Sequence, residues 1–318
     1  MNEDIKLERP RDFSETVNTL FSFAVKHIKP LSILFLTYAI VPVLLTGIVG
    51  SYFSISINGV NWQSYIEQII QGGTFISPPN LESLILLIIL SFIAQTFISG
   101  LVYEYLIVYK SNNGEKIKLI DVWYKFKNDA PALFGYQILL FLIFLFVSII
   151  LSLIFSILSN ATFALILMII IIIIPFLIFI YVPLRFILMV KVAEQRNFTY
   201  SINRCFQLVK NNWWITFGLI IIISLIVGIM GFAFALPSFI YSAIQGFLSI
   251  QNGSNVEINT FVNGIFTTIS SIGSSWLSII LNLLIGIHFF SLREKADKNT
   301  LIQQIESIGN NSETEETL

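Results

Sequence analysis

The stretch LILMIIIIIIPFLIF, residues 165–179, decides the fold class of this chain. It is almost purely aliphatic and lacks the polar face that a helix on the surface of a water-soluble protein needs. A bilayer core of about 30 Å is crossed by about 20 mostly apolar helical residues, since each unpaired peptide group in hydrocarbon costs several kcal/mol. The stretch therefore predicts a membrane-spanning helix.

The composition of the whole chain agrees with a membrane solvent. Hydrophobic residues make up 55% of the 318 positions and charged residues only 12%, against about 25% charged in an ordinary soluble domain. The formal net charge is −1, with 18 Lys and Arg against 19 Asp and Glu, so no basic excess favours a nucleic-acid partner. The single cysteine, Cys205, excludes an internal disulfide and a cysteine-rich metal cluster.

Five further stretches are long and apolar enough to span a bilayer. One of them continues to residue 248, but Gly228, Gly231 and Pro237 favour a kink or an end near residue 236, with residues 238–248 along the interface. The sequence thus predicts an all-α integral membrane protein whose membrane domain covers residues 31–292. The six spans are expected at about residues 31–53, 84–109, 133–158, 163–190, 213–236 and 265–292.

Lys and Arg are confined to alternate segments between these spans. All 18 lie near one predicted face, while the connections 54–82, 159–162 and 250–264 have none. Because basic residues near span ends stay in the cytoplasm, both termini are expected there. Residues 1–30 form a cytoplasmic amphipathic segment without a secretory signal, and residues 293–318 form an acidic cytoplasmic tail that we expect to be disordered.

Each pair of spans is preceded by a segment of amphipathic pattern. Residues 12–27 and 198–210 share the spacing of their apolar positions, and residues 119–126 repeat it more weakly. We therefore expect three helix hairpins, each preceded by a cytoplasmic amphipathic helix in the headgroup layer, although two unrelated amphipathic helices would also give this similarity. The expected interface anchors are Phe13, Phe21, Phe198, Phe206, Trp213 and Trp214.

Segments around the fourth and fifth spans resemble a known family. They are VPLR at 182–185, residues 197–209, and NWWITFG at 212–218. These segments are similar to the YciC-like family of bacterial six-span proteins and to the membrane domain of some glycerophosphodiester phosphodiesterases. RDFSETVN at 11–18 resembles uncharacterised membrane proteins of Bacteroidota. The resemblance implies a multi-pass protein of the bacterial inner membrane with no settled activity, and we expect no phosphodiester hydrolysis because the soluble catalytic domain is missing from this sequence.

The sequence contains no recognisable catalytic or metal-binding motif. His27 and His288 are the only histidines, and neither has a partner at metal-ligand spacing. No HExxH, GxSxG or Walker-type glycine loop occurs. We therefore expect no enzymatic activity, no metal and no cofactor, with an intramembrane enzyme as the alternative.

Two charged residues fall inside the spans, at a similar predicted depth near the cytoplasmic ends. Glu104 lies in the second span and Arg185 in the fourth, where an unpaired charge at the bilayer centre costs about 2.5 to 3.5 kcal/mol. They either form an ion pair that holds two hairpins in register or face a water-filled cytoplasmic vestibule. Gln95 and Asn282, from polar seams in the second and sixth spans, complete the candidate intramembrane site, although such seams also serve helix packing.

Two functional hypotheses follow from these features. The first is a non-enzymatic scaffold or accessory subunit of the inner membrane that binds lipid headgroups or partner proteins in envelope or lipid homeostasis. The second is a transporter, channel or lipid-moving protein that uses the vestibule near Glu104 and Arg185. Membrane lipids, and possible further membrane proteins, are the expected partners in both cases, and the sequence does not fix the oligomeric state.

Overall fold

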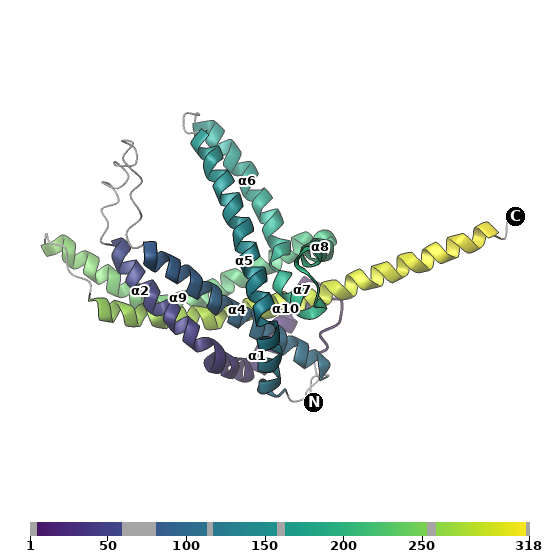
Figure 1. Cartoon of the computed structure of the whole chain (residues 1–318), viewed down its shortest axis with the longest axis horizontal. Coiled ribbons are helices and arrows are strands. Elements are labelled where there is room, and N and C mark those ends of the chain that lie inside the picture. The colour runs from purple at the N-terminus through teal and green to yellow at the C-terminus, as the bar shows by residue number, and fades with distance from the viewer. Residues whose placement is uncertain (1–4, 59–80, 113–116, 158–162, 253–258, 316–318) are drawn as a thin grey trace. The chain divides into compact units, whose positions relative to one another are not determined.

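The computed structural model describes residues 5–58, 81–112, 117–157, 163–252 and 259–315, and every regular element in these ranges is a helix. Six long helices, labelled in Figure 1, are apolar enough to cross a membrane. This confirms the prediction of an all-helical chain with six candidate spans, as in an integral multi-pass membrane protein. The arrangement as three hairpins with amphipathic helices stays a prediction.

The first candidate span begins earlier in the chain than predicted. α1 (Phe13–Leu34), a π-helical segment η1 (Phe35–Ala39) and α2 (Ile40–Asn58) follow each other without a gap. The expected amphipathic segment 12–27 and the expected span 31–53 are therefore parts of one helical run that passes through Pro30. A helix can continue past a proline when it gives up one backbone hydrogen bond.

The other helices follow the predicted order. α5 joins the expected amphipathic segment 119–126 to the third span, and a 3₁₀ turn, η3, joins α8 to α9. The remaining elements are α4 (Leu81–Ser111), α5 (Leu119–Ile157), α6 (Phe163–Leu184), α7 (Ile187–Glu194), α8 (Phe198–Val209), η3 (Lys210–Asn212), α9 (Trp213–Asn252) and α10 (Thr260–Glu315).

A helix ends directly after Pro183, whereas another helix continues through Pro237. The predicted fourth span, 163–190, divides at Arg185, where the Phe186 backbone N–H donates to the Pro183 carbonyl at 3.0 Å and α6 ends. At the second proline, α9 continues through Pro237 to Asn252, so the helix does not end near residue 236, and the predicted kink there stays a prediction. In hydrocarbon, a helix that loses one bond at a proline costs less than a chain that leaves the helix and exposes several peptide groups.

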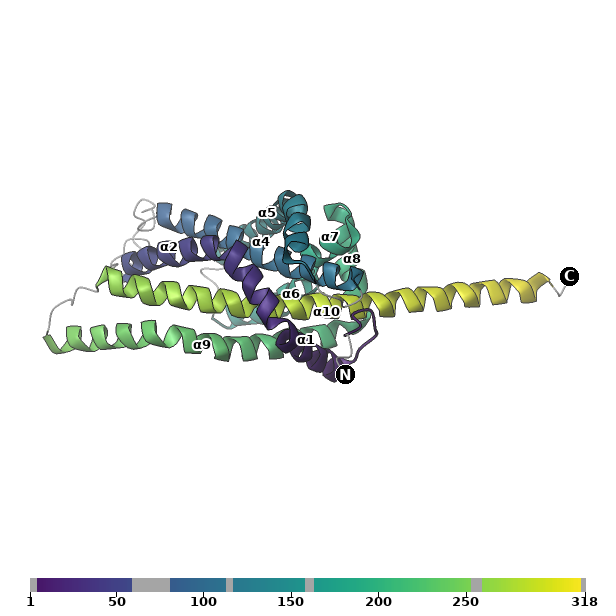
Figure 2. The same cartoon turned by 90° about the horizontal axis from the view of Figure 1, so that it is seen from below.

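The sixth candidate span continues into the tail 293–318, for which the sequence predicts disorder. α10 continues to Glu315, and Figure 2 shows it as one unbroken helix. Extension of an existing helix avoids the costly nucleation step, and the Glu294–Lys298 pair, 3.9 Å apart, adds a favourable i,i+4 contact. Residues 316–318 lie outside the described part of the chain.

The chain divides into two compact units. The first comprises Met1–Ile28, Gly100–Ile223 and Ile280–Leu318, and the second comprises Lys29–Ser99 and Ser224–Ile279. In the second unit, small residues allow close helix contact: a Cβ at Gly47 would lie 2.9 Å from the Thr268 Cα. The Trp276 indole N–H also donates to the Ser32 hydroxyl at 2.9 Å.

Aromatic side chains fill part of the core of the first unit. Phe23 stacks on His27 with ring centroids 4.2 Å apart, and the His27 Nδ1 lies 2.7 Å from the Tyr105 hydroxyl. Gly286 brings α10 close to α4, since a Cβ there would overlap the Leu106 side chain. These contacts join α1 and α10 to α4 within the first unit.

Candidate functional site

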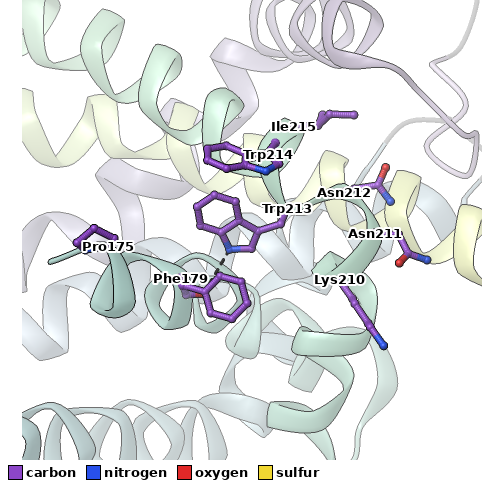
Figure 3. Close-up of a pocket in the computed structure, with 8 residues that line it drawn as sticks. All are labelled: Pro175, Phe179, Lys210, Asn211, Asn212, Trp213, Trp214 and Ile215. Atoms are coloured by element: carbon purple, nitrogen blue, oxygen red, sulfur yellow. Dashed lines mark hydrogen bonds between the residues drawn. The ribbon is translucent and has the colours of Figure 1, made fainter. Parts of the chain in front are cut away.

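A pocket of about 470 Å³ lies between α6 and the junction of η3 with α9 in the first unit (Figure 3). Its position follows from the helix break after Pro183 and from the 3₁₀ turn that joins α8 to α9. The residues that line it are Pro175, Phe179, Lys210, Asn211, Asn212, Trp213, Trp214 and Ile215.

The α6 wall of the pocket contains a carbonyl freed by proline chemistry. Pro183 has no N–H, so the Phe179 carbonyl, four residues earlier, loses its normal helical donor. The Trp213 indole Nε1 donates to this carbonyl instead, at 3.3 Å. Figure 3 shows this bond as the dashed line between the two residues. An orphaned acceptor on α6 is thus joined to the first residue of α9.

Stacked rings hold the Trp213 indole in place. Its ring centroid lies 5.6 Å from that of Phe179 and 5.0 Å from that of Phe217, with interplanar angles of 27° and 16°. Trp214 meets Trp213 at 90° with centroids 4.9 Å apart, and Trp214 is 78% exposed. One indole is therefore fixed by packing, while the other presents a free ring at the pocket edge.

Polar groups line the other wall of the pocket. Lys210 and Asn211 are exposed and Asn212 is half-buried. Within the part of the chain that the structure describes, these three side chains have no hydrogen-bond partner. An ammonium group and two amides are thus available as donors, together with the indole N–H of Trp214.

The predicted anchors Trp213 and Trp214 both line this pocket. Lys210 and Phe179 line it as well, but the sequence did not predict that they would lie beside the two tryptophans. The Phe179–Trp213 contact joins residues 34 positions apart, and no local pattern encodes it. The one available sequence signal was Pro183, which marks Phe179 as the residue with a free carbonyl.

The four phenylalanine anchors are half-buried. The Phe198 ring meets Tyr136 of α5 with centroids 5.1 Å apart, and the Phe13 ring approaches Gly218 of α9. On α8, the fully buried face is formed by other residues, Ser201, Cys205 and Leu208 among them. Phe198 and Phe13 therefore contribute helix contacts, and their seating in a headgroup layer stays a prediction, as it does for Phe21 and Phe206.

Glu104 and Arg185 lie in the first unit but form no ion pair in the described part of the chain. Glu104 is 2% exposed, and its Oε1 atom has no hydrogen-bond partner. The buried Nε of Arg185 also has none, while its guanidinium lies over the Tyr181 ring, 5.7 Å from the centroid. The structure therefore does not show the ion pair that was one of the two predicted roles of Glu104 and Arg185.

A polar chain that the sequence did not indicate reaches the neighbourhood of Glu104. The Asp129 carboxyl lies close enough to Glu104 for the two groups to interact electrostatically. Asp129 accepts a hydrogen bond of 2.5 Å from the Gln195 Nε2, and Lys191 Nζ donates to the Gln195 Oε1 at 3.1 Å. Gln195 ends α7 in the left-handed conformation, with φ 50°.

The two predicted amides lie in different units of the chain. Asn282 is 3% exposed, and its Oδ1 accepts a hydrogen bond of 3.1 Å from the Tyr103 hydroxyl in the first unit. Gln95 belongs to the second unit, where its backbone carbonyl accepts from the Ser99 hydroxyl at 2.8 Å.

Among the described residues, no group of three or more His, Cys, Asp or Glu side chains could hold a metal ion. Comparisons of the chain with family models, with curated proteins and with solved structures find no match. The geometry of the pocket at Lys210–Ile215 and of the polar residues around Glu104 is therefore the basis for any functional proposal.

Proposed function

We propose that this chain is a non-enzymatic multi-pass membrane protein that binds phospholipid headgroups and serves as a scaffold or accessory subunit in envelope or lipid homeostasis. The pocket formed by Phe179 and residues 210–215 carries this proposal. It combines a cation, amide donors and exposed aromatic rings in one cavity. Phosphate oxygens suit the first two, and indole rings prefer the boundary between headgroups and acyl chains.

The charge pattern of the sequence supports a site at the cytoplasmic surface. Lys210 lines the pocket and is the last basic residue before the predicted fifth span, 213–236. Each basic residue near an anionic membrane surface contributes about 1 kcal/mol to attraction. We place both termini and this pocket on the cytoplasmic side of a bacterial inner membrane, in agreement with the proposed YciC-like resemblance, and we expect lipids and further membrane proteins as partners, without nucleic acid.

Native mass spectrometry of the detergent-purified protein tests the proposal. The unmodified chain is expected to retain phospholipid, and a Lys210→Gln, Asn211→Ala double variant is expected to retain about tenfold less, because charge-assisted hydrogen bonds to phosphate are lost. Lys118→Gln is the matched control, since Lys118 is an exposed lysine outside the pocket. Equal lipid retention by all three proteins would refute headgroup binding at this pocket.

One observation favours a second function, movement of a solute or lipid through a vestibule near Glu104 and Arg185. Each of these residues has a buried polar atom without a hydrogen-bond partner, and water is the usual partner of such atoms. If this function holds, vesicles that contain the protein show flux of an ion, solute or fluorescent lipid, and Glu104→Gln reduces that flux. Vesicles with no flux above protein-free controls would exclude it.

A further inference from the structure

The Phe179 carbonyl is an acceptor with spare capacity on the wall of the pocket. Pro183 cannot donate to it, and the Trp213 indole does so at 3.3 Å, which is long for an N–H···O bond with a usual distance of about 2.9 to 3.0 Å. A carbonyl oxygen has two lone pairs and accepts a second donor. A bound ligand that brings an N–H group can therefore satisfy this oxygen more fully than the indole does.

Aromatic rings next to this carbonyl favour a cation. Trp213 already stacks with Phe179 and Phe217, but Trp214 is exposed and stands at 90° to Trp213, so its ring is open to a ligand at the same cavity (Figure 3). The face of an aromatic ring attracts an ammonium group, and tryptophan attracts it most strongly. This wall of the pocket therefore suits a positively charged donor.

The wall formed by η3 has the opposite preference. Lys210, Asn211 and Asn212 offer an ammonium and two amide groups, which bind phosphate oxygens. One cavity thus presents donors for an anion on one wall and an acceptor with ring faces for a cation on the other. A ligand that carries both an anionic and a cationic group could use both sets of partners.

We propose that the pocket selects an aminophospholipid, with an ethanolamine-type headgroup whose phosphate binds at Lys210 and whose ammonium donates to the Phe179 carbonyl. This inference rests on the proposed function and specifies its ligand. A trimethylammonium headgroup has no N–H for the carbonyl, and a glycerol headgroup has no cation for the rings. The apolar lining residues Pro175 and Ile215 favour the lipid over the free headgroup.

Pro183→Ala tests the proposal without altering any side chain that lines the pocket. The new N–H at position 183 can donate to the Phe179 carbonyl within α6 and so occupy the acceptor. Delipidated protein in detergent is given equal amounts of phosphatidylethanolamine, phosphatidylcholine and phosphatidylglycerol, and the bound lipids are counted by native mass spectrometry. The unmodified protein is expected to prefer phosphatidylethanolamine about tenfold, and Pro183→Ala is expected to bind all three about equally.

Further variants keep the test informative if Pro183→Ala fails to fold. Trp214→Leu removes an exposed ring, so it is expected to lower the binding of phosphatidylethanolamine more than that of phosphatidylglycerol. Pro131→Ala, in the exposed part of α5, is the matched proline control and keeps the preference. Excess soluble phosphoethanolamine is expected not to displace the lipid.

The outcomes separate this inference from the function on which it rests. Binding of phospholipid without preference for ethanolamine, or with preference for phosphatidylglycerol, overturns the inference and leaves headgroup binding intact. Displacement by soluble phosphoethanolamine shows a free headgroup compound as the ligand and overturns the assignment to a lipid. Binding of no phospholipid by the unmodified protein overturns both proposals.

Discussion

The Trp213 indole donates a hydrogen bond to the Phe179 carbonyl at 3.3 Å, and Pro183 is the reason that this carbonyl is free. A proline in α6 and a tryptophan at the start of α9 therefore act together, although each has a simpler interpretation as a helix kink or an interface anchor. The bond joins two candidate membrane helices at one end of a pocket. Loss of this hydrogen bond should lower the stability of the protein and change the α6 wall of the pocket.

Trp213→Phe is expected to destabilise the protein by about 0.5 to 1.5 kcal/mol, because the ring stack is largely kept while the hydrogen bond is lost. Thermal unfolding in detergent measures this change. The matched control is Trp214→Phe, whose side chain is 78% exposed and whose replacement should cost less than about 0.5 kcal/mol. In a Pro183→Ala background the cost of Trp213→Phe should fall, since α6 then supplies its own donor. Equal costs in both backgrounds would contradict the assigned bond.

Gly286→Ala is expected to destabilise the first unit by about 1 to 3 kcal/mol. A Cβ at this position would overlap Leu106 of α4 and would lie 3.8 Å from the Met189 sulfur of α7. Gly135→Ala in α5 is the control, because nothing lies within 4 Å of the position of its new Cβ. That control is expected to be neutral or stabilising by up to about 1 kcal/mol, since alanine is the better helix former. Unfolding midpoints of the two variants should move in different directions, and a shared direction would exclude the close α4–α10 contact.

The six candidate spans were predictable because hydrophobic run length alone identifies them. The continuation of the helices through Pro30 and Pro237 was not predictable, since proline usually ends or kinks a helix and the packing that keeps it continuous is not visible in the sequence. Tail disorder was predicted from the polar residues 310–318. In the structure α10 continues from the preceding span as far as Glu315, since an existing helix needs no new nucleation step.

The candidate site was predictable only in part, for a related reason. A charge in an apolar run is visible in sequence, so Glu104 and Arg185 could be identified, but their partners depend on tertiary packing. Asp129 lies near Glu104, and Tyr181 lies beneath Arg185. The indole–carbonyl bond of the pocket likewise arises only when α6 and α9 come together.

Glu8 gives the protein an acid-sensitive contact at its N-terminal segment. Its carboxylate accepts from Lys110 Nζ at 2.6 Å and also pairs with Arg293. Burial raises the pKa of Glu8, but the hydrogen bonds and charges of Lys110 and Arg293 lower it more, so the pKa lies below the ordinary value of 4.5. The stabilisation is therefore fully present above the unfolded pKa, and it is lost as the pH falls through the lower folded pKa.

Unfolding of the unmodified protein and of Glu8→Gln, followed between about pH 7 and 3, measures this contribution. The two stability curves are expected to be separated at neutral pH and to converge below about pH 4. Glu15→Gln is the control, since its partner Arg9 forms a more exposed pair at 3.2 Å, and it should give a smaller separation. A gap between the first two curves that stays constant with pH would contradict the role of the Glu8 charge.

Gln195 adopts a left-handed backbone conformation, with φ 50°, at the end of α7. A side chain with a Cβ is strained there by about 1 kcal/mol, whereas glycine is not. Gln195→Ala and Gln195→Gly both lose the 2.5 Å hydrogen bond to Asp129, so the difference between them reports the backbone alone. We expect the glycine variant to be more stable than the alanine variant by about 1 kcal/mol.

The same pair of substitutions at Gln207, an exposed position within α8, should give the opposite order, because glycine weakens a helix interior by about 1 kcal/mol. Chemical unfolding of the four variants in one detergent decides the matter, and the same order at both positions would show that Gln195 carries no left-handed strain.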